Sequence, residues 1–295
     1  MKNILRDKLM FSVVIPLYNK AYGIERALKS VINQSGNFIY EVIIVNDGST
    51  DGSEQLAEKF ISEHITIIHQ ENAGVSIARN IGIKNSKYEF ICFLDADDWW
   101  ELDYFFTLYN LIISFPNECF FLMGFQKISK LDKKVVRLSK APKVFKNFGN
   151  NFLNTRGLVT PSIVVKKDIL YEAGLFPDRV ILSEDLMLWS KIINKYSVVY
   201  TPHVVSNIYH EYDNSREGRA NNIPYVLQYY ADVENTIQNL KGFLLYIYVA
   251  HLYQSAKSGD FLGWRARWLI GFKIFPFFAF LASVSVLLVW IKNVS

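Results

Sequence analysis

Four short runs of apolar residues in the first hundred positions constrain the fold of this chain most strongly. Stretches with helical spacing separate the runs, which lie at Phe11–Leu17, Glu41–Val45, Ile65–Ile68 and Phe90–Leu94. A strand that is apolar throughout, rather than at alternate positions, is buried on both faces, which is typical of a parallel sheet covered by helices. The order strand–helix–strand with short connections therefore predicts a doubly wound α/β domain.

The pattern loosens after Asp98, where helical and extended stretches mix. We predict helices at Leu102–Ile113 and Leu186–Ile193, and extended segments at Cys119–Ile128, Val135–Leu138, Ser162–Val165 and Val198–Tyr209. The predicted organisation is one α/β domain over residues 1–215, with halves at about 10–100 and 101–215, followed by a helical region over residues 216–295.

Composition limits the function classes and the compartment. The 295 residues carry 32 Lys and Arg against 28 Asp and Glu, and this small excess does not predict nucleic-acid binding. The two cysteines, Cys92 and Cys119, lack the spacing of a zinc site or a disulfide framework, so we expect free thiols in a reducing cytoplasm. The polar N-terminus, Met1–Met10, does not predict a signal peptide.

Polar signatures follow three of the four predicted strands. They occupy Pro16–Lys20, Asn46–Ser53 and Asp95–Asp98. Ligands of a doubly wound sheet bind beyond the carboxyl ends of its strands, so these stretches are the candidate ligand-binding positions. Within the second stretch, Asp47 either accepts hydrogen bonds from a base or ribose or belongs to a capped turn that opens the next helix.

The Asp95–Asp98 stretch holds three carboxylates at the end of a buried strand. Carboxylates packed this closely repel one another unless a cation joins them. Mg²⁺ or Mn²⁺ prefers oxygen ligands and shares them with substrate phosphates. The sequence therefore favours a metal site over the alternative, an acidic helix N-terminus stabilised by the helix dipole.

Three other charged residues are weaker candidates when each is taken alone. Arg79 lies on the predicted helix after the third strand, where it either meets a diphosphate or is a solvated helix residue. Glu184 and Asp185 precede an amphipathic helix. Asp185 either caps that helix or removes a proton from an attacking hydroxyl group.

Six motifs in order extend these local signals across residues 13–189. They are VVIPLYNK, VNDGSTDGS, ENAGVSIARNIGI, FLDADDWW, TPSIVVKKDILYEAGLF and SEDLMLW. With this set and order, the chain resembles the second family of glycosyltransferases with the GT-A fold. The resemblance implies a GT-A type, mainly parallel doubly wound sheet. It also implies transfer of a sugar from a nucleotide-diphosphate donor, most often a UDP-sugar, with inversion of the anomeric centre.

The resemblance implies a role for each donor-side candidate. Pro16 and Tyr18 line the base pocket, and Asp47 contacts the nucleoside. Arg79 lies near the base or the diphosphate, and Asp95 approaches the ribose.

The remaining implied roles concern the metal and the acid–base chemistry. Asp97 binds the Mn²⁺ or Mg²⁺ that bridges the diphosphate, and Asp185 is the catalytic base with Glu184 beside it. The chain departs from the family pattern downstream, where Tyr212 stands at the position of the family histidine and His210 lies two residues earlier. His210 either reaches the metal or diphosphate or is an exposed strand-end residue.

The leading hypothesis is a sugar transferase that acts on a glycan or lipid-linked acceptor in cell-surface polysaccharide or glycolipid synthesis. A nucleotidyltransferase is an alternative, but it normally has a Gly-rich basic triphosphate loop where this chain has PLYNKAYG. The third hypothesis is a non-catalytic, transferase-like scaffold at a membrane. The presence of both Asp97 and Asp185 speaks against a scaffold.

The C-terminal region lies outside the six motifs. Ile274–Ile291 is an uncharged apolar run that approaches the ~20 residues of a membrane-spanning helix, and Arg265, Arg267 and Lys273 precede it. We expect this helical tail to associate with membrane lipids, across or along the bilayer, and to hold the catalytic domain at the cytoplasmic face. The alternative is a pair of helices packed on the catalytic domain.

Overall fold

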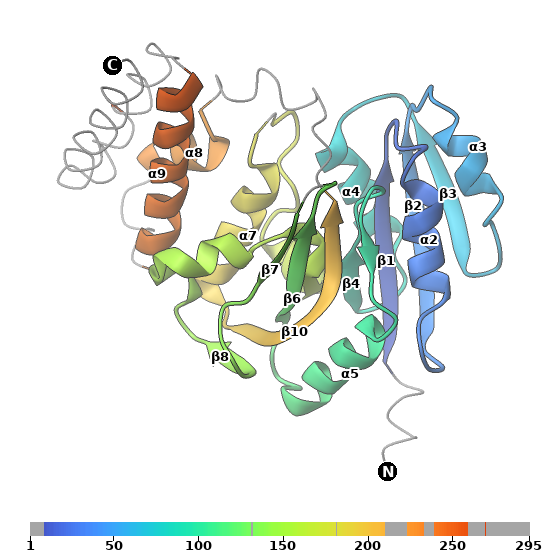
Figure 1. Cartoon of the computed structure of the whole chain (residues 1–295), viewed down its shortest axis with the longest axis horizontal. Helices are drawn as coiled ribbons and strands as arrows, with labels where there is room; N and C mark the ends of the chain where they lie inside the picture. The colour runs from blue at the N-terminus through green and yellow to red at the C-terminus, as the bar shows by residue number, and fades with distance from the viewer. Residues whose placement is uncertain are drawn as a thin grey trace. The chain divides into compact units, whose positions relative to one another are not determined.

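The computed structural model describes residues 9–130, 132–180, 182–209, 223–232, 239–258 and 269 (Figure 1). They fall into two compact units. The first contains those within Met1–Lys146, Arg156–Arg179 and Lys195–Glu211, and the second those within Asn147–Thr155, Val180–Asn194 and Tyr212–Ser295. The domain boundary near residue 215 stays a prediction.

The first unit is built around one ten-stranded sheet. Its strand order is β3-β2-β1-β4-β9-β6-β10-β5, with β7 paired to β6 and β8 paired to β10. The strands are Met10–Leu17 (β1), Ile39–Asp47 (β2), Ile65–Gln70 (β3), Phe90–Phe93 (β4), Trp99–Trp100 (β5), Phe120–Ile128 (β6), Lys133–Val136 (β7), Lys143–Phe145 (β8), Ile163–Lys166 (β9) and Val198–Tyr209 (β10).

The four apolar runs form the parallel part of this sheet, as predicted. Strand β1 pairs in parallel with β2 and β4, and β2 pairs in parallel with β3. Beyond β4 the sheet is mixed, because β9 is antiparallel to both β4 and β6, whereas β10 is parallel to β6. The longest pairings are parallel, so the expected α/β class with a mainly parallel sheet is confirmed.

Helices cover this sheet and follow the predicted apolar spacing. They are Ile24–Ile32 (α2), Ser53–Glu58 (α3), Val75–Asn85 (α4), Tyr104–Ser114 (α5) and Lys167–Glu172 (α6), with a 3₁₀ turn at Thr160–Ser162 (η3). Helix α2 buries Ile24, Ala27, Leu28 and Val31, which lie on one face at helical spacing. Helix α4 lies very close to β1, because a Cβ atom on Gly82 would be 2.3 Å from a methyl carbon of Val14.

Several elements differ from the sequence prediction. Strands β5 and β8 and helix α6 were not predicted, since they have only two to six residues and show no readable period. Strand β7 lies two residues before the predicted segment. Trp100 of β5 is held by tertiary packing instead, with its ring stacked on Tyr104 at 3.7 Å.

The second unit is helical in its described part. It contains η1 (Phe148–Asn150), α7 (Glu184–Lys195), α8 (Tyr225–Asp232) and α9 (Lys241–Ser258), while η2 (Phe152–Gly157) contributes to both units. Helix α7 buries Trp189 completely, and Ser190 Oγ lies 3.1 Å from the hydroxyl of Tyr230 on α8. Gly149 permits close contact with the start of α9, because a Cβ there would be 2.5 Å from the Asn239 carbonyl oxygen.

No helix in the described part of the chain has both the length and the apolar character needed to cross a bilayer. The apolar run Ile274–Ile291 lies outside the described residues. Membrane association of the tail therefore stays an expectation from the sequence.

Candidate active site

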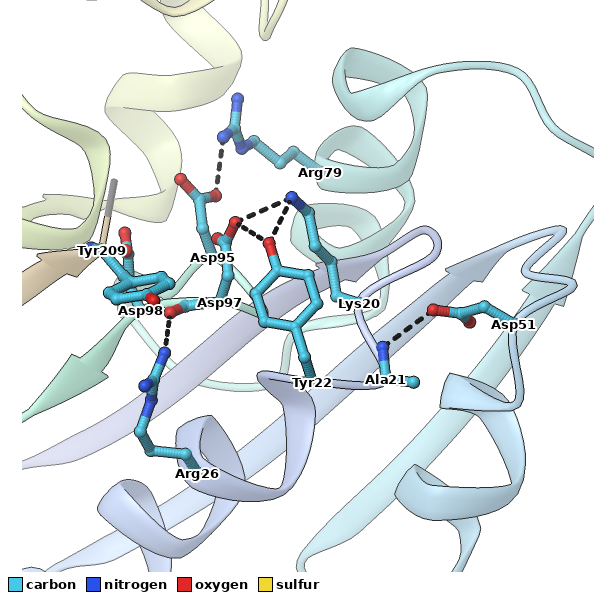
Figure 2. A network of polar contacts seen from close by, with 10 residues as sticks. All are labelled: Lys20, Ala21, Tyr22, Arg26, Asp51, Arg79, Asp95, Asp97, Asp98 and Tyr209. Atoms are coloured by element: carbon cyan, nitrogen blue, oxygen red, sulfur yellow. Dashed lines mark hydrogen bonds and ion pairs between the residues drawn. The ribbon is translucent and has the colours of Figure 1, made fainter. Parts of the chain in front are cut away.

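The carboxyl ends of β1, β2 and β4 meet at one edge of the sheet, because these strands are parallel neighbours. The three polar signatures leave the sheet at this edge, as the sequence predicted, and Figure 2 shows the side chains that they bring together. Pro16 lies half-buried near the end of β1, and Tyr18, which is 48% exposed, follows it. Tyr18 is thus accessible to a ligand at this edge.

The loops after β1 and β2 are joined by hydrogen bonds. Asn19 adopts a left-handed φ of 51°, and its Oδ1 accepts a hydrogen bond from the Thr50 amide at 2.8 Å. Asp51 Oδ2 accepts one from the Ala21 amide at 2.9 Å. Burial acts to raise the pKa of Asp51, but hydrogen bonds from Ser53 and Ala21 outweigh it and lower the pKa. The carboxylate of Asp51 thereby fixes the loop that leads into α2.

Asp47 is almost fully buried and holds the loop before α4. Its Oδ1 accepts hydrogen bonds from the side-chain amide of Gln70 and from the Ala73 amide, and its Oδ2 accepts one from the Gly74 amide at 2.9 Å. Only 3% of Asp47 is exposed. The structure therefore brings Asp47 to the predicted edge and also gives it the turn-stabilising contacts of the alternative interpretation.

Two of the three clustered aspartates are paired with cations of the protein. Asp95 Oδ1 lies 2.8 Å from an Nη atom of Arg79, whose side chain is buried, so Arg79 is not a solvated helix residue. Asp97 Oδ2 lies 2.8 Å from Lys20 Nζ and accepts a hydrogen bond from the Tyr22 hydroxyl at 3.0 Å. Burial acts to lower the pKa of Lys20, but the hydrogen bonds to Asp97 and Tyr22 raise it.

Asp98 differs from its neighbours because it is buried and faces a backbone amide. Its Oδ1 accepts a hydrogen bond from the Tyr209 amide at 2.7 Å, and the residue is 3% exposed. Burial raises the pKa of Asp98 well above its usual value, and the charges of Asp95 and Asp97 raise it further. Asp98 therefore ties this loop to the end of β10.

Arg26 of α2 contacts the main chain of the same loop and two aromatic rings beside it. An Nη atom donates to the Asp97 carbonyl oxygen at 2.5 Å, and the guanidinium carbon lies 4.0 Å from the centre of the Trp99 ring and 5.0 Å from that of Tyr209. Stacking of guanidinium on aromatic rings is a favourable contact of arginine. Arg26 thus fixes the main chain of Asp97, while Lys20 and Tyr22 hold its side chain.

Gly23 permits the loop and α2 to approach each other. A Cβ at this position would lie 2.6 Å from the Ala96 carbonyl oxygen and 2.7 Å from Asp97 Cα.

We expect Gly23→Ala to displace the loop and to weaken binding of UDP with Mn²⁺ by about tenfold, measured by calorimetry. Gly36→Ala, in a distant turn, is the control for a general loss of stability. Equal UDP affinity in wild type and Gly23→Ala would contradict this account of the loop.

Comparison with known proteins decides the family. The sequence profile described as glycosyl transferase family 2 matches residues 12–173, more than half of the chain. The chain belongs to this family. The matched residues include the polar edge of the first unit, and the resemblance drawn from the six motifs is confirmed.

Individual relatives agree with this family membership. GlyA, a glycosyltransferase of Streptococcus pneumoniae, is 41% identical over 111 residues, which cover 37% of this chain and 16% of GlyA. GgaA, a minor teichoic acid biosynthesis protein of Bacillus subtilis, is 43% identical over 96 residues, which cover 30% of this chain and 22% of GgaA. The matches span less than a third of either relative.

A solved structure shows the same fold. TarS of S. aureus (residues 1–349), in complex with UDP-GlcNAc, superposes with a TM-score of 0.69. The superposition covers 90% of this chain and 81% of the TarS chain, at 19% sequence identity. The likeness confirms the GT-A architecture of this family 2 member.

Members of family 2 typically depend on a metal, so the fit of the clustered aspartates to a cation matters. Within the described residues, the group of three acids or histidines close enough to share one ion is Glu54, Glu58 and His69. It lies beside the carboxyl end of β2, where Asn46 contacts both Glu54 and His69. Asp95, Asp97 and Asp98 do not form such a three-ligand group, because each faces a separate partner. Asp97 alone fits a metal well, since its Oδ2 already receives an ammonium cation and the side chain is 20% exposed.

The predicted base lies in the second unit of this glycosyltransferase. Glu184 and Asp185 form the first turn of α7, and Asp185 Oδ1 accepts a hydrogen bond from the Leu186 amide at 2.7 Å. Both side chains are half-buried. A placement at a helix start agrees with capping and with catalysis alike. His210, the other uncertain candidate, lies outside the described residues.

Sequence analysis did not single out Tyr22, Arg26 or Tyr209, and named Lys20 only as the end of a motif. Lys20 and Tyr22 lie in the loop after β1, so their place at the ligand edge was a usable signal. Arg26 and Tyr209 had no such signal, because they reach the loop of Asp97 and Asp98 from elements 71 and 111 residues away in the sequence.

Proposed function

We propose that this family 2 enzyme transfers a sugar from a UDP-sugar to a glycan or lipid-linked acceptor, with inversion, in cell-surface polymer synthesis. The observation that carries the proposal is Asp97, a half-buried carboxylate paired with the Lys20 ammonium group at the carboxyl edge of the parallel sheet. The pair of buried Arg79 and half-buried Asp95 lies beside it. The names of two similar proteins support it: TarS is described in complex with UDP-GlcNAc, and GgaA with teichoic acid biosynthesis.

On the donor side, the charges at this edge suit a diphosphate. Arg79 presents a planar guanidinium, and Lys20 presents a compact ammonium group, both of which bind phosphate oxygens. Pro16, Tyr18 and Asp47 would bind the base and nucleoside, and Asp95 the ribose. Asp97 would hold Mn²⁺ or Mg²⁺, and the bound ion would offset negative charge that develops on the leaving diphosphate.

On the acceptor side, the reaction needs a base. The acceptor hydroxyl oxygen forms a bond to the anomeric carbon while the bond from that carbon to the diphosphate oxygen breaks. The carboxylate of Asp185 takes the hydroxyl proton, with Glu184 beside it, and UDP leaves with the electron pair of the broken bond. One in-line displacement inverts the anomeric centre.

A panel of nucleotide sugars tests the proposal. We expect one UDP-sugar, added with Mn²⁺, to raise the melting temperature more than UDP, GDP-sugars or TDP-sugars do. A ligand that binds only the folded state stabilises it in proportion to the logarithm of its concentration over its Kd. Stabilisation by a GDP- or TDP-sugar alone would overturn the choice of nucleotide.

Lys20 is expected to compete with the metal for Asp97. The Lys20 ammonium group forms an ion pair with Asp97 Oδ2. Lys20→Met should therefore tighten Mn²⁺ binding without nucleotide by about fivefold, an affinity change that corresponds to the free energy of a partly exposed ion pair. Electron paramagnetic resonance of free Mn²⁺ measures this affinity. Tyr22→Phe, which keeps the ammonium group, is the control and should have a smaller effect. Weaker Mn²⁺ binding in Lys20→Met would show that Lys20 orients Asp97 instead.

For localisation, the proposal is attachment at the cytoplasmic face of a membrane through the tail. The uncharged run Ile274–Ile291 and the preceding Arg265, Arg267 and Lys273 support it. We expect the full chain to fractionate with membranes, and a chain that lacks Gly271–Ser295 to be soluble and to bind UDP. A full chain in the soluble fraction, together with an insoluble truncation, would instead assign the tail to the protein core.

A further inference from the structure

The positive charge of the chain is concentrated in one segment outside the active site. Eight of the 32 Lys and Arg residues lie between positions 127 and 146, but only one of the 28 Asp and Glu residues does. The rest of the chain has more acids than bases. These basic residues are Lys127, Lys130, Lys133, Lys134, Arg137, Lys140, Lys143 and Lys146.

The basic segment lies against the β6–β10 part of the sheet. Strand β7 pairs with the end of β6, and β8 pairs with the start of β10, so the connection between them runs along these strands (Figure 1). All six basic side chains from Lys133 to Lys146 are exposed. None of the six forms an ion pair within the part of the chain that the structure describes. Their charge is therefore available to a ligand.

An open cavity of about 610 Å³ lies within this basic segment. Its walls are Arg137, Leu138, Ser139, Lys140, Thr201, Pro202 and His203. A bulge in β10 between Thr201 and Ser206 shifts its register on β6 and forms one wall. Gly124 of β6 permits this bulge, because a Cβ there would lie 2.7 Å from the Pro202 carbonyl oxygen. One wall of this open cavity is thus set by the backbone of β6 and β10.

The charge inside the cavity comes from Arg137 and Lys140. Arg137 Nε donates to the Pro202 carbonyl oxygen at 3.1 Å, which anchors the guanidinium group at the bulge. The neighbouring Leu138 amide donates to the Tyr200 hydroxyl at 2.9 Å and fixes the main chain. His203 Nε2 lies 2.6 Å from Asp103 Oδ2, so an acid already accompanies the histidine. An anchored guanidinium beside a lysine is a favourable site for a phosphate group.

We infer that this basic face, residues 133–146 with the cavity at Arg137 and Lys140, binds the phosphate groups of a polyanionic acceptor chain. The inference rests on the proposed transferase function, since it assigns a substrate class to it. His203 precedes Tyr209 on β10 by six residues, so the cavity lies at most about 20 Å along the strand from the loop of Asp98. A chain that delivers its end to the donor can therefore also fill the cavity. A concave site suits a flexible chain better than it suits a flat bilayer.

A soluble polyanion tests the inference directly. The probe is fluorescent inorganic polyphosphate, and its anisotropy is measured with the full chain at rising salt. The test variant carries Arg137→Gln, Lys140→Gln and Lys143→Gln. The matched control carries Lys29→Gln, Lys59→Gln and Lys84→Gln, which remove the same charge from exposed positions elsewhere. Binding of UDP with Mn²⁺ is measured in parallel, so that failure of the donor site is recognised separately.

We expect wild type and control to bind polyphosphate within twofold of each other, and the test variant to bind it about tenfold or more weakly, with a shallower salt dependence. UDP binding should be equal in all three proteins. Absence of polyphosphate binding at low salt, or an equal loss in test and control variants, would overturn the inference. Binding to phosphatidylglycerol vesicles without binding to polyphosphate would also overturn it and assign this face to a membrane.

Discussion

Asp97→Asn is expected to lower the rate of sugar transfer by about 10²–10³-fold or more, and addition of EDTA to wild type should have the same effect. Asparagine keeps the shape of the side chain but removes the charge that attracts a divalent cation, and loss of one preorganised electrostatic contact commonly costs this factor. The rate is measured as UDP released in the presence of Mn²⁺. Mn²⁺ affinity, measured separately, should fall with it.

Asp98→Asn is the matched control for this prediction. Burial raises the pKa of Asp98, and an asparagine oxygen can still accept the hydrogen bond from the Tyr209 amide, so Mn²⁺ affinity should change little. An equal loss of Mn²⁺ affinity in Asp97→Asn and Asp98→Asn would contradict the separate roles of these residues. Undiminished turnover in EDTA would falsify the metal role of Asp97.

Asp185→Asn should abolish most transfer without affecting the donor. We expect the variant to fold, to bind UDP as wild type does, and to lose about 10²–10⁴-fold in rate, which is the usual contribution of a general base. Its amide can still accept the hydrogen bond from Leu186, so α7 should keep its first turn. Calorimetry with UDP separates binding from chemistry.

Glu184→Gln is the matched comparison for Asp185→Asn. It makes the same change in charge one position earlier in α7 and should lose less activity, because Glu184 is only the neighbour of the proposed base. If UDP binding fell in step with activity in Asp185→Asn, then Asp185 would be a ligand of the donor or a helix cap. A larger loss in Glu184→Gln would move the role of base to Glu184.

The sheet was predictable from sequence where its signal is local. Strands β1, β2 and β4 are buried on both faces and therefore appear as continuous apolar runs, and α2 shows its buried face at every third or fourth residue. The edge strand β3 is only partly buried. The order β9-β6-β10 was not predictable, since those pairings join segments far apart in the chain. Strand β5 has two residues and depends on Trp100 packing.

The positions of the main site residues were predictable from the sequence, but their contacts were not. Asp47 ends β2, and Asp95 and Asp97 follow β4. Because both strands pair in parallel with β1 between them, the common edge of these residues follows from topology. Their partners were not predictable. Arg26 meets Asp97 from a helix 71 residues earlier, and the separation of roles between Asp97 and Asp98 depends on burial, which no local pattern reveals.

The products of donor turnover test the central claim most directly. Phosphorus NMR of wild type with its UDP-sugar and Mn²⁺ distinguishes which bond breaks. A glycosyltransferase breaks the bond between the anomeric carbon and the diphosphate, so we predict that UDP accumulates, slowly with water and faster with an acceptor, and that Asp97→Asn releases almost none. Pyrophosphate chemistry, with UMP or free pyrophosphate as product, or no turnover in the presence of a bound donor and acceptor, would contradict the account.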